Sequence, residues 1–212
     1  MKFEHNNISP LDSRYADKIL PIRESFSEKS LIKTRFIIEI NWLLFLCNKL
    51  PKHFQKLSNV SVKKILKFRD SFSDKDILKI KKIESVTNHD IKAIEYYISN
   101  FFKKDKQLRK YINLIHFGLT SEDVNSLSYA IIIKDGSEHY LKNLYSLNKV
   151  LKTLSNKWKS IPLLSRTHGQ AASPTTIGKE LKVFESRILR EITIFKKIMP
   201  LAKFSGATGN YH

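Results

Sequence analysis

The 212-residue sequence has only one cysteine, Cys47, and it lies within an apolar stretch of helical spacing. A disulfide framework or a cysteine-rich metal site needs several thiols, so the sequence excludes both. His89, His116 and His168 also lack the close spacing that zinc ligands show. A lone cysteine of this kind is usually a small core residue, and its isolation fits a reducing compartment. We therefore expect no metal, no other cofactor and a cytoplasmic location.

Glycine and proline are scarce as well, with six residues of each. Few turns together with many Leu, Ile, Lys and Glu indicate long helices. No apolar run approaches the roughly 18 residues that suggest a membrane-spanning helix. The first ten residues, MKFEHNNISP, lack the apolar core of a signal peptide. We therefore expect a protein without a membrane partner and without a secretion signal.

Arginine is rare among the basic residues, since eight Arg accompany thirty Lys, and the net charge is +18. The Lys are scattered along the chain, whereas a nucleic-acid interface more often has one basic stripe with Arg at the positions that read bases. We interpret the excess charge as solvated helix surface that also attracts an anionic substrate, and we expect no nucleic-acid partner. The alternative, a basic helical nucleic-acid-binding module, predicts binding that weakens steeply with salt.

Apolar residues recur at three- and four-residue spacing in several stretches, which predicts an all-α protein. Residues 1–24 are irregular, and the first long helix follows them and ends before Pro51. The predicted helices span about residues 27–50, 61–70, 73–84, 90–102, 121–158 and 174–199. Several of them begin with residues that commonly cap helices. The expected capping residues are Ser25 with Glu28, Ser73 with Asp76, Asn88 or Asp90, and Ser173 followed by Pro174.

Four groups of polar or reactive side chains precede or interrupt these helices. They are Arg14 and Tyr15; Asn88, His89 and Asp90; His116, Thr120 and Ser121; and Thr167, His168 and Gln170. Each group alone is explained by a helix cap, a core histidine or a surface position. Together they favour an acid–base enzyme with an anionic substrate, because a helix start and an Arg bind anions and an imidazole exchanges protons near neutral pH.

Five sequence blocks carry a resemblance to a known family. They are SPLDSRY, IESVTNHDIKAIEYY, IHFGLTSEDVNSLSYA, IPLLSRTHGQAASPTTIGKE and GATGNYH. In this order they resemble the N-terminal part of the bacterial adenylosuccinate lyase family, within the fumarase/aspartase superfamily. The resemblance covers essentially all 212 residues. TNHDIKAIEY, TSEDVN and SRTHGQ together are more specific than a Thr-His pair before a helix, which would indicate the superfamily alone.

The resemblance implies a fold, a reaction and an assembly. The fold would be a helical N-terminal domain over residues 1–112, followed over residues 113–212 by the first long helices of a fumarase/aspartase-type bundle. The reaction would be the elimination of fumarate from adenylosuccinate, giving AMP, and from succinyl-aminoimidazole-carboxamide ribotide in purine biosynthesis. No redox cofactor or metal would be needed, and the complete enzyme would be a homotetramer.

The resemblance also implies roles for individual residues. His168 matches the catalytic histidine that protonates the leaving nitrogen. The other matches are to substrate-binding positions, and they are Arg14, Tyr15, Asn88, His89, Asp90, Thr120, Ser121 and Gln170, with His116 as a substrate contact or a supporting residue. Two positions depart from the family, because Ser13 stands where Gly is usual and Ala171 where Pro is usual.

The resemblance ends before the family's Ser-rich loop, which supplies the general base, and before most of its helix bundle. We therefore expect this chain to be truncated and inactive by itself. Two alternatives remain open at this point. One is a non-catalytic remnant of the enzyme, and the other is a lyase that acts on a different succinyl compound.

Overall fold

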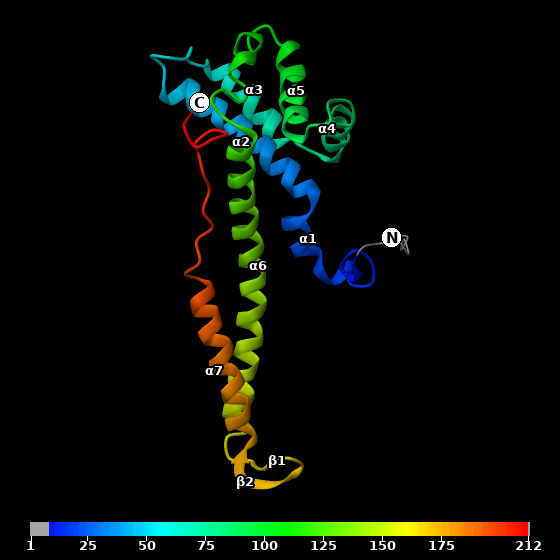
Figure 1. Ribbon diagram of the computed structural model, residues 1–212, viewed down its shortest axis with the longest axis vertical. Helices are drawn as coiled ribbons and strands as arrows, with labels where there is room; N and C mark the ends of the chain where they lie inside the picture. Colours follow the sequence, from blue (N-terminus) through cyan, green and yellow to red (C-terminus); the bar gives the residue numbers. More distant parts are fainter. Residues whose placement is uncertain (1–8, 212) are drawn as a thin grey trace. The chain divides into compact units, whose positions relative to one another are not determined.

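The computed structural model describes residues 9–211, which are mostly helical (Figure 1). The chain divides into two compact units, one with the residues up to Ile133 and from Pro200 onward, the other with Lys134–Met199. The elements are, in order, the 3-10 helices η1 (Pro10–Asp12) and η2 (Ala16–Ile19), α1 (Leu20–Phe26), α2 (Glu28–Lys49), α3 (Asn59–Asp70), α4 (Asp74–Thr87), α5 (Asp90–Lys103), the 3-10 helix η3 (Arg109–Leu114), α6 (Ser121–Lys157), the strands β1 (Pro162–Thr167) and β2 (Gln170–Thr176), and α7 (Ile177–Phe195).

Phe36 of α2 lies at the centre of the core of the first unit. Its ring is fully buried and stacks on Phe72 with 4.6 Å between ring centroids, while Phe68 and Tyr97 meet it edge-on. Cys47 lies in the same core, where burial raises the pKa of its thiol to about 11. Each large apolar side chain buried in this way stabilises the fold by ~1.5–3 kcal/mol. The expectation that Cys47 is a core residue is confirmed.

α2 begins at Glu28, and its N-cap is Ser27, whose hydroxyl oxygen accepts from the Ser30 N–H at 3.3 Å. The expected capping box of Ser25 with Glu28 is wrong. Ser25 belongs to the short helix α1, and its hydroxyl donates back to the Pro21 carbonyl. α1 is too short to show an apolar periodicity, so the sequence pattern does not predict it as a separate helix before α2.

α4 begins as the sequence predicts. The Asp76 carboxylate accepts from the Ser73 N–H at 3.0 Å and from the Ser73 hydroxyl at 2.8 Å. Burial opposes ionisation of Asp76, but the hydrogen bonds from Lys79, Ser73 and Tyr97 outweigh it and lower its pKa to about 2. The expected pairing of Ser73 with Asp76 is confirmed, and it fixes the first turn of α4.

The second unit contains a β-hairpin that was not expected. β1 and β2 pair antiparallel, with Thr167 opposite Gln170 and Leu164 opposite Pro174. The two residues between the strands, His168 and Gly169, have φ values of 49° and 76°. Positive φ at both central residues is what a type I′ hairpin turn requires. A two-stranded ribbon has only edge strands, which tolerate a proline that cannot donate a hydrogen bond.

The hairpin moves the start of the last helix. α7 begins at Ile177, with Thr176 as its N-cap accepting from the Lys179 N–H at 3.1 Å, and it ends at Phe195. The expected start at Ser173 and Pro174 is therefore wrong, because both residues lie in β2. Within this unit α7 runs beside the second half of α6 (Figure 1), and the buried Asn148 amide donates to the Glu185 carbonyl at 2.7 Å.

The long predicted helix from Ser121 is confirmed by α6, which has 37 residues. No helix within residues 9–211 is long and apolar enough to cross a membrane. The predicted division into domains at residue 112 stays a prediction.

Candidate active site

The Asn88–Asp90 segment joins α4 to α5 in a tight reversal of the backbone. Asn88 ends α4 in the left-handed region, with φ of 50°, which Asn tolerates better than most residues. His89 is the N-cap of α5, and its Nδ1 accepts from the Lys92 N–H at 3.2 Å. The expectation that Asn88 or Asp90 caps α5 is therefore wrong. Asn88 and His89 are both exposed, so a ligand can reach them.

Asp90 turns its carboxylate towards α2. One oxygen accepts from the Ile91 N–H at 2.8 Å, and the other lies 2.9 Å from the Arg35 guanidinium. The Arg35 side chain is only 8% exposed, whereas that of Asp90 is 45% exposed. Arg35 Nε is buried without a hydrogen-bond partner among the described residues. Arg35 therefore holds a partly exposed carboxylate in place beside the exposed His89.

The His116 side chain packs against α2, where it forms an ion pair with Glu39. Its ring Nδ1 is 2.6 Å from one Glu39 oxygen, and its backbone N–H donates to the other at 3.1 Å. The Glu39 side chain is fully buried, and that of His116 is 15% exposed. The backbone of His116 has φ of 60°, in the left-handed region. The hypothesis of a satisfied core histidine describes His116 best.

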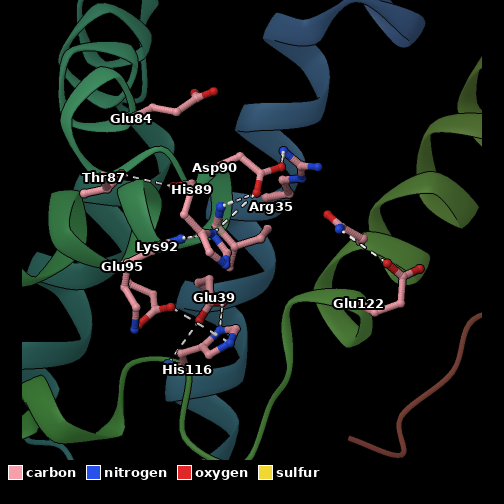
Figure 2. Close-up of polar contacts among 12 residues, drawn as sticks. Arg35, Glu39, Glu84, Thr87, His89, Asp90, Lys92, Glu95, His116 and Glu122 are labelled. Carbon is pink, nitrogen blue, oxygen red and sulfur yellow. Dashed lines mark hydrogen bonds and ion pairs between the residues drawn. The ribbon is translucent and has the colours of Figure 1, made fainter. Parts of the chain in front are cut away.

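α5 supplies the remaining charges around His116 (Figure 2). The Glu95 carboxylate lies 3.9 Å from His116 Nε2, and Lys92 pairs with Glu95 at 2.7 Å. Burial lowers the pKa of His116, but the hydrogen bond and charge of Glu39, together with the charge of Glu95, outweigh burial and raise it overall. When His116 is protonated, its Nδ1–H donates a hydrogen bond to Glu39, and its Nε2–H lies near the Glu95 carboxylate.

The start of α6 is fixed by Asp123. Its buried carboxylate accepts from the Thr120 N–H at 2.9 Å, and also from Lys203 at 2.8 Å and the Ser205 N–H at 3.0 Å. Burial opposes ionisation of Asp123, but these hydrogen bonds lower its pKa overall. Thr120 and Ser121, both half-buried, therefore lie at a helix start that the Asp123 carboxylate caps.

The structure brings two of the four predicted groups together. Residues 88–90 and the segment that leads from His116 to Ser121 are both held by α2, through Arg35 and Glu39. Arg14 and Tyr15 lie in the exposed turn between η1 and η2, with the guanidinium 5.4 Å from the centre of the Tyr15 ring. Among residues 9–211, no hydrogen bond or ion pair joins them to the other candidate residues.

His168 and Gln170 belong to the second unit. His168 occupies the first position of the hairpin turn, and Gln170 is the first residue of β2. Both are exposed, and His168 lies in the left-handed region at the tip of the ribbon. No group of three or more His, Cys, Asp or Glu side chains within residues 9–211 is arranged to hold a metal ion.

Arg35 and Glu39 were missed as members of the site, although the sequence contains a signal for them. Both fall on the apolar face of α2, among Ile32, Phe36 and Ile40. A charged residue on a core-facing position is rarely buried unless it is paired. Charged residues on such a face therefore indicate that each is paired, and the structure shows that both partners lie on other elements.

A family model described as "Lyase" matches residues 13–212. The chain belongs to this lyase family. It is 41% identical over 209 residues to an adenylosuccinate lyase of Buchnera aphidicola subsp. Acyrthosiphon pisum (strain APS), which covers 97% of the chain and 45% of that relative. It is 37% identical over 207 residues to an adenylosuccinate lyase of Escherichia coli (strain K12), covering 97% of the chain and 45% of that relative.

Solved structures confirm the fold of the lyase chain. A fumarate lyase from Mesorhizobium sp. BNC1 aligns with a TM-score of 0.73 and 23% identity, over 92% of this chain and 43% of the other. A 3-carboxy-cis,cis-muconate lactonizing enzyme from Pseudomonas putida aligns with a TM-score of 0.71 and 17% identity, over 90% and 42%. The fold is thus of the mostly helical fumarase/aspartase type. The chain spans about half the length of the relatives it matches.

Proposed function

We propose that this lyase chain forms part of an adenylosuccinate lyase. The observation that carries the proposal is the 37–41% identity to proteins named adenylosuccinate lyase over 97–98% of the chain. The reaction eliminates fumarate from adenylosuccinate to give AMP, and from succinyl-aminoimidazole-carboxamide ribotide in the same way. The net charge of +18 supports a substrate that carries phosphate and carboxylate groups.

The chemistry divides between proton removal and proton donation. A base removes the proton from the carbon next to a carboxylate, and the electron pair left there forms the new double bond. The carbon–nitrogen bond breaks, and the departing nitrogen takes a proton. His168 is proposed as the donor of that proton, because an exposed imidazole can carry one near neutral pH. Asn88, His89, Asp90, Thr120, Ser121 and Gln170 are proposed as substrate contacts.

Arg14 and Tyr15 are proposed to hold the nucleotide part of the substrate. A guanidinium binds phosphate through two parallel hydrogen bonds, and an exposed ring offers a face on which a base can stack. The general base is not assigned to any of the 212 residues. We therefore propose that turnover requires the remainder of the lyase fold, which the relatives carry, and that the complete enzyme is a homotetramer.

Fumarate release tests the proposal. The complete gene product that contains residues 1–212, called the full-length protein below, is purified and mixed with adenylosuccinate, and fumarate is followed by ultraviolet absorbance. A panel of other succinyl compounds is run beside it. The proposal expects AMP and fumarate in equal amounts from adenylosuccinate. Turnover of a different succinyl compound alone would show a lyase with another substrate, and no turnover of any member would favour a non-catalytic protein.

A further inference from the structure

α2 carries two buried opposite charges one helical turn apart. Arg35 is 6% exposed and Glu39 is 1% exposed, and both lie on the face that packs into the core. A buried charge without a partner is strongly unfavourable, and here each charge has its partner on another element. Replacing such a pair by apolar residues is often neutral or stabilising, so stability alone gives no reason for two buried charges at these positions.

The partners of these charges come from two different candidate segments. Arg35 pairs with Asp90, the residue after His89, and Glu39 pairs with His116, four residues before Thr120. Figure 2 shows both contacts reaching α2 from segments that are far apart in the sequence. One face of one helix therefore sets the positions of both segments relative to each other.

The contact with the second segment constrains its backbone as well as its side chain. Glu39 accepts from the backbone N–H of His116 and contacts the ring of the same residue. Trp42, three residues further along α2, donates from Nε1 to the Phe117 carbonyl at 2.8 Å. The Leu119 N–H then donates to the His116 carbonyl at 3.1 Å. These bonds hold the backbone of residues 116–119, the segment directly before Thr120, against α2.

We infer that Arg35 and Glu39 are positioning residues of the proposed active site, which hold the His89 segment and the Thr120–Ser121 segment in register on α2. The inference rests on the proposed function, because it assigns these segments to substrate binding. Neither residue needs to touch the substrate. His116 acts through the same contact, since its Nδ1 is bound to Glu39 and its Nε2 faces Glu95.

The kinetic test uses Glu39→Gln in the full-length protein. A Gln cannot accept hydrogen bonds from both the backbone N–H and the ring with two oxygens, so the segment before Thr120 should shift. A misplacement of about 1 Å near a reacting centre can cost roughly 10²-fold in rate. We expect kcat/KM on adenylosuccinate to fall by that order while circular dichroism and the unfolding transition still show a folded protein.

Glu28→Gln is the matched control, because it makes the same change on the same helix in an exposed ion pair with Lys81. It should leave kcat/KM unchanged. His116→Asn and the double variant with Glu39→Gln complete a double-mutant cycle. The inference expects the double variant to lose little more kcat/KM than either single variant does. Additive losses, or a folded Glu39→Gln variant with normal kinetics, would overturn it.

Arg35→Lys in the full-length protein tests the contact with Asp90. It also provides an independent test of the inference if the Glu39→Gln variant does not fold. A Lys keeps the charge but lacks the rigid fork that holds Asp90. We expect a raised KM with a folded protein, and unchanged kinetic constants would overturn the inference.

A readout that does not need activity separates the inference from the proposed function. NMR titration of the His116 ring should show its pKa fall in Glu39→Gln and stay unchanged in Glu28→Gln. If the wild-type protein has no lyase activity but the titration behaves in this way, the proposed function fails while the contact stands. An unchanged titration in Glu39→Gln would refute the contact itself.

Discussion

At the scale of single residues, the His116–Glu39 pair should make stability depend on pH. The pair raises the folded-state pKa of His116 above its unfolded value, against the opposing effect of burial. Glu39 on α2, and Glu95 and Lys92 on α5, are the charged groups that act on the ring. The stabilising contribution is therefore complete below the unfolded pKa of histidine and is lost as pH rises through the higher folded value.

The measurement is the free energy of unfolding in urea between pH 5 and 9, for the wild type and for His116→Asn. The wild type should lose stability across this range, and His116→Asn should lack that component. His53→Asn is the control, because His53 is exposed. Equal pH slopes for the wild type and His116→Asn would show that the pair contributes nothing.

His168→Gln tests the proposed proton donor. A general acid typically contributes 10²–10⁴-fold to the rate. Because the proton is needed mainly in the transition state, kcat of the full-length protein should fall by this order while KM changes much less. His139→Gln, on an exposed position of α6, should leave both constants unchanged. A His168→Gln variant that keeps half of the normal kcat would remove His168 from the mechanism.

At the scale of elements, the first turn of α7 packs unusually close to the end of α6. A Cβ placed on Gly178 would lie 2.3 Å from the Ser155 carbonyl oxygen and 2.5 Å from the Lys159 Cα. The Gly178 N–H also donates to the Trp158 carbonyl at 3.0 Å. Both neighbours are backbone, so neither can move away as a flexible side chain could. Glycine is thus required where the hairpin returns to the helices.

Gly178→Ala should therefore destabilise the second unit. Overpacking against a rigid neighbour typically costs ~1–3 kcal/mol. The measurement is the midpoint of thermal unfolding, with Gly169→Ala as a comparison. A Cβ at Gly169 meets no atom within 4 Å, so only its positive φ opposes the substitution there. An unchanged or raised midpoint for Gly178→Ala would contradict the close packing.

Most helices could be predicted from the sequence, because long apolar periodicity determines them. α2, α4, α5 and α6 appear where the spacing of apolar residues places them. The hairpin could not be predicted in this way, because its strands are mostly exposed and have no alternating apolar pattern. Only the His168–Gly169 dipeptide, with two left-handed residues, marks the turn.

The candidate site was predicted as a set of residues but not as a network. The polar groups at the helix breaks stand out in the sequence, since they interrupt the apolar pattern. The contacts among them depend on Arg35 and Glu39, whose partners lie 55 and 77 positions away in the chain. Such pairing depends on the tertiary fold, and local spacing gives no information about it. The charged residues on the core face of α2 indicate that partners exist, but not which residues those partners are.

At the scale of the whole molecule, many large apolar side chains of α6 and α7 are exposed. They include Leu127, Tyr129, Ile133, Tyr140, Leu147, Val150, Phe184, Leu189 and Ile194. Exposed apolar patches of this kind usually mark interaction surfaces. Leaving such a side chain in water forfeits ~1.5–3 kcal/mol relative to burial. They support the proposal that these helices pack into a larger helical assembly.

We therefore expect residues 1–212, expressed alone, to associate through α6 and α7 and to release no fumarate. Light scattering gives the mass, and the absorbance assay gives turnover on the same sample. Leu147→Glu and Phe184→Glu should reduce association, whereas Leu78→Glu, on the exposed face of α4, should not. A monomer that turns over adenylosuccinate would contradict both parts of this prediction.

The most direct test of the central claim is the release of fumarate from adenylosuccinate by the full-length protein, compared with the other succinyl compounds. The account predicts saturable turnover that yields one AMP for each fumarate, with adenylosuccinate among the best substrates. It also predicts that Glu39→Gln and His168→Gln both reduce this turnover while Glu28→Gln and His139→Gln do not. A folded, full-length protein that leaves adenylosuccinate unchanged would contradict the account.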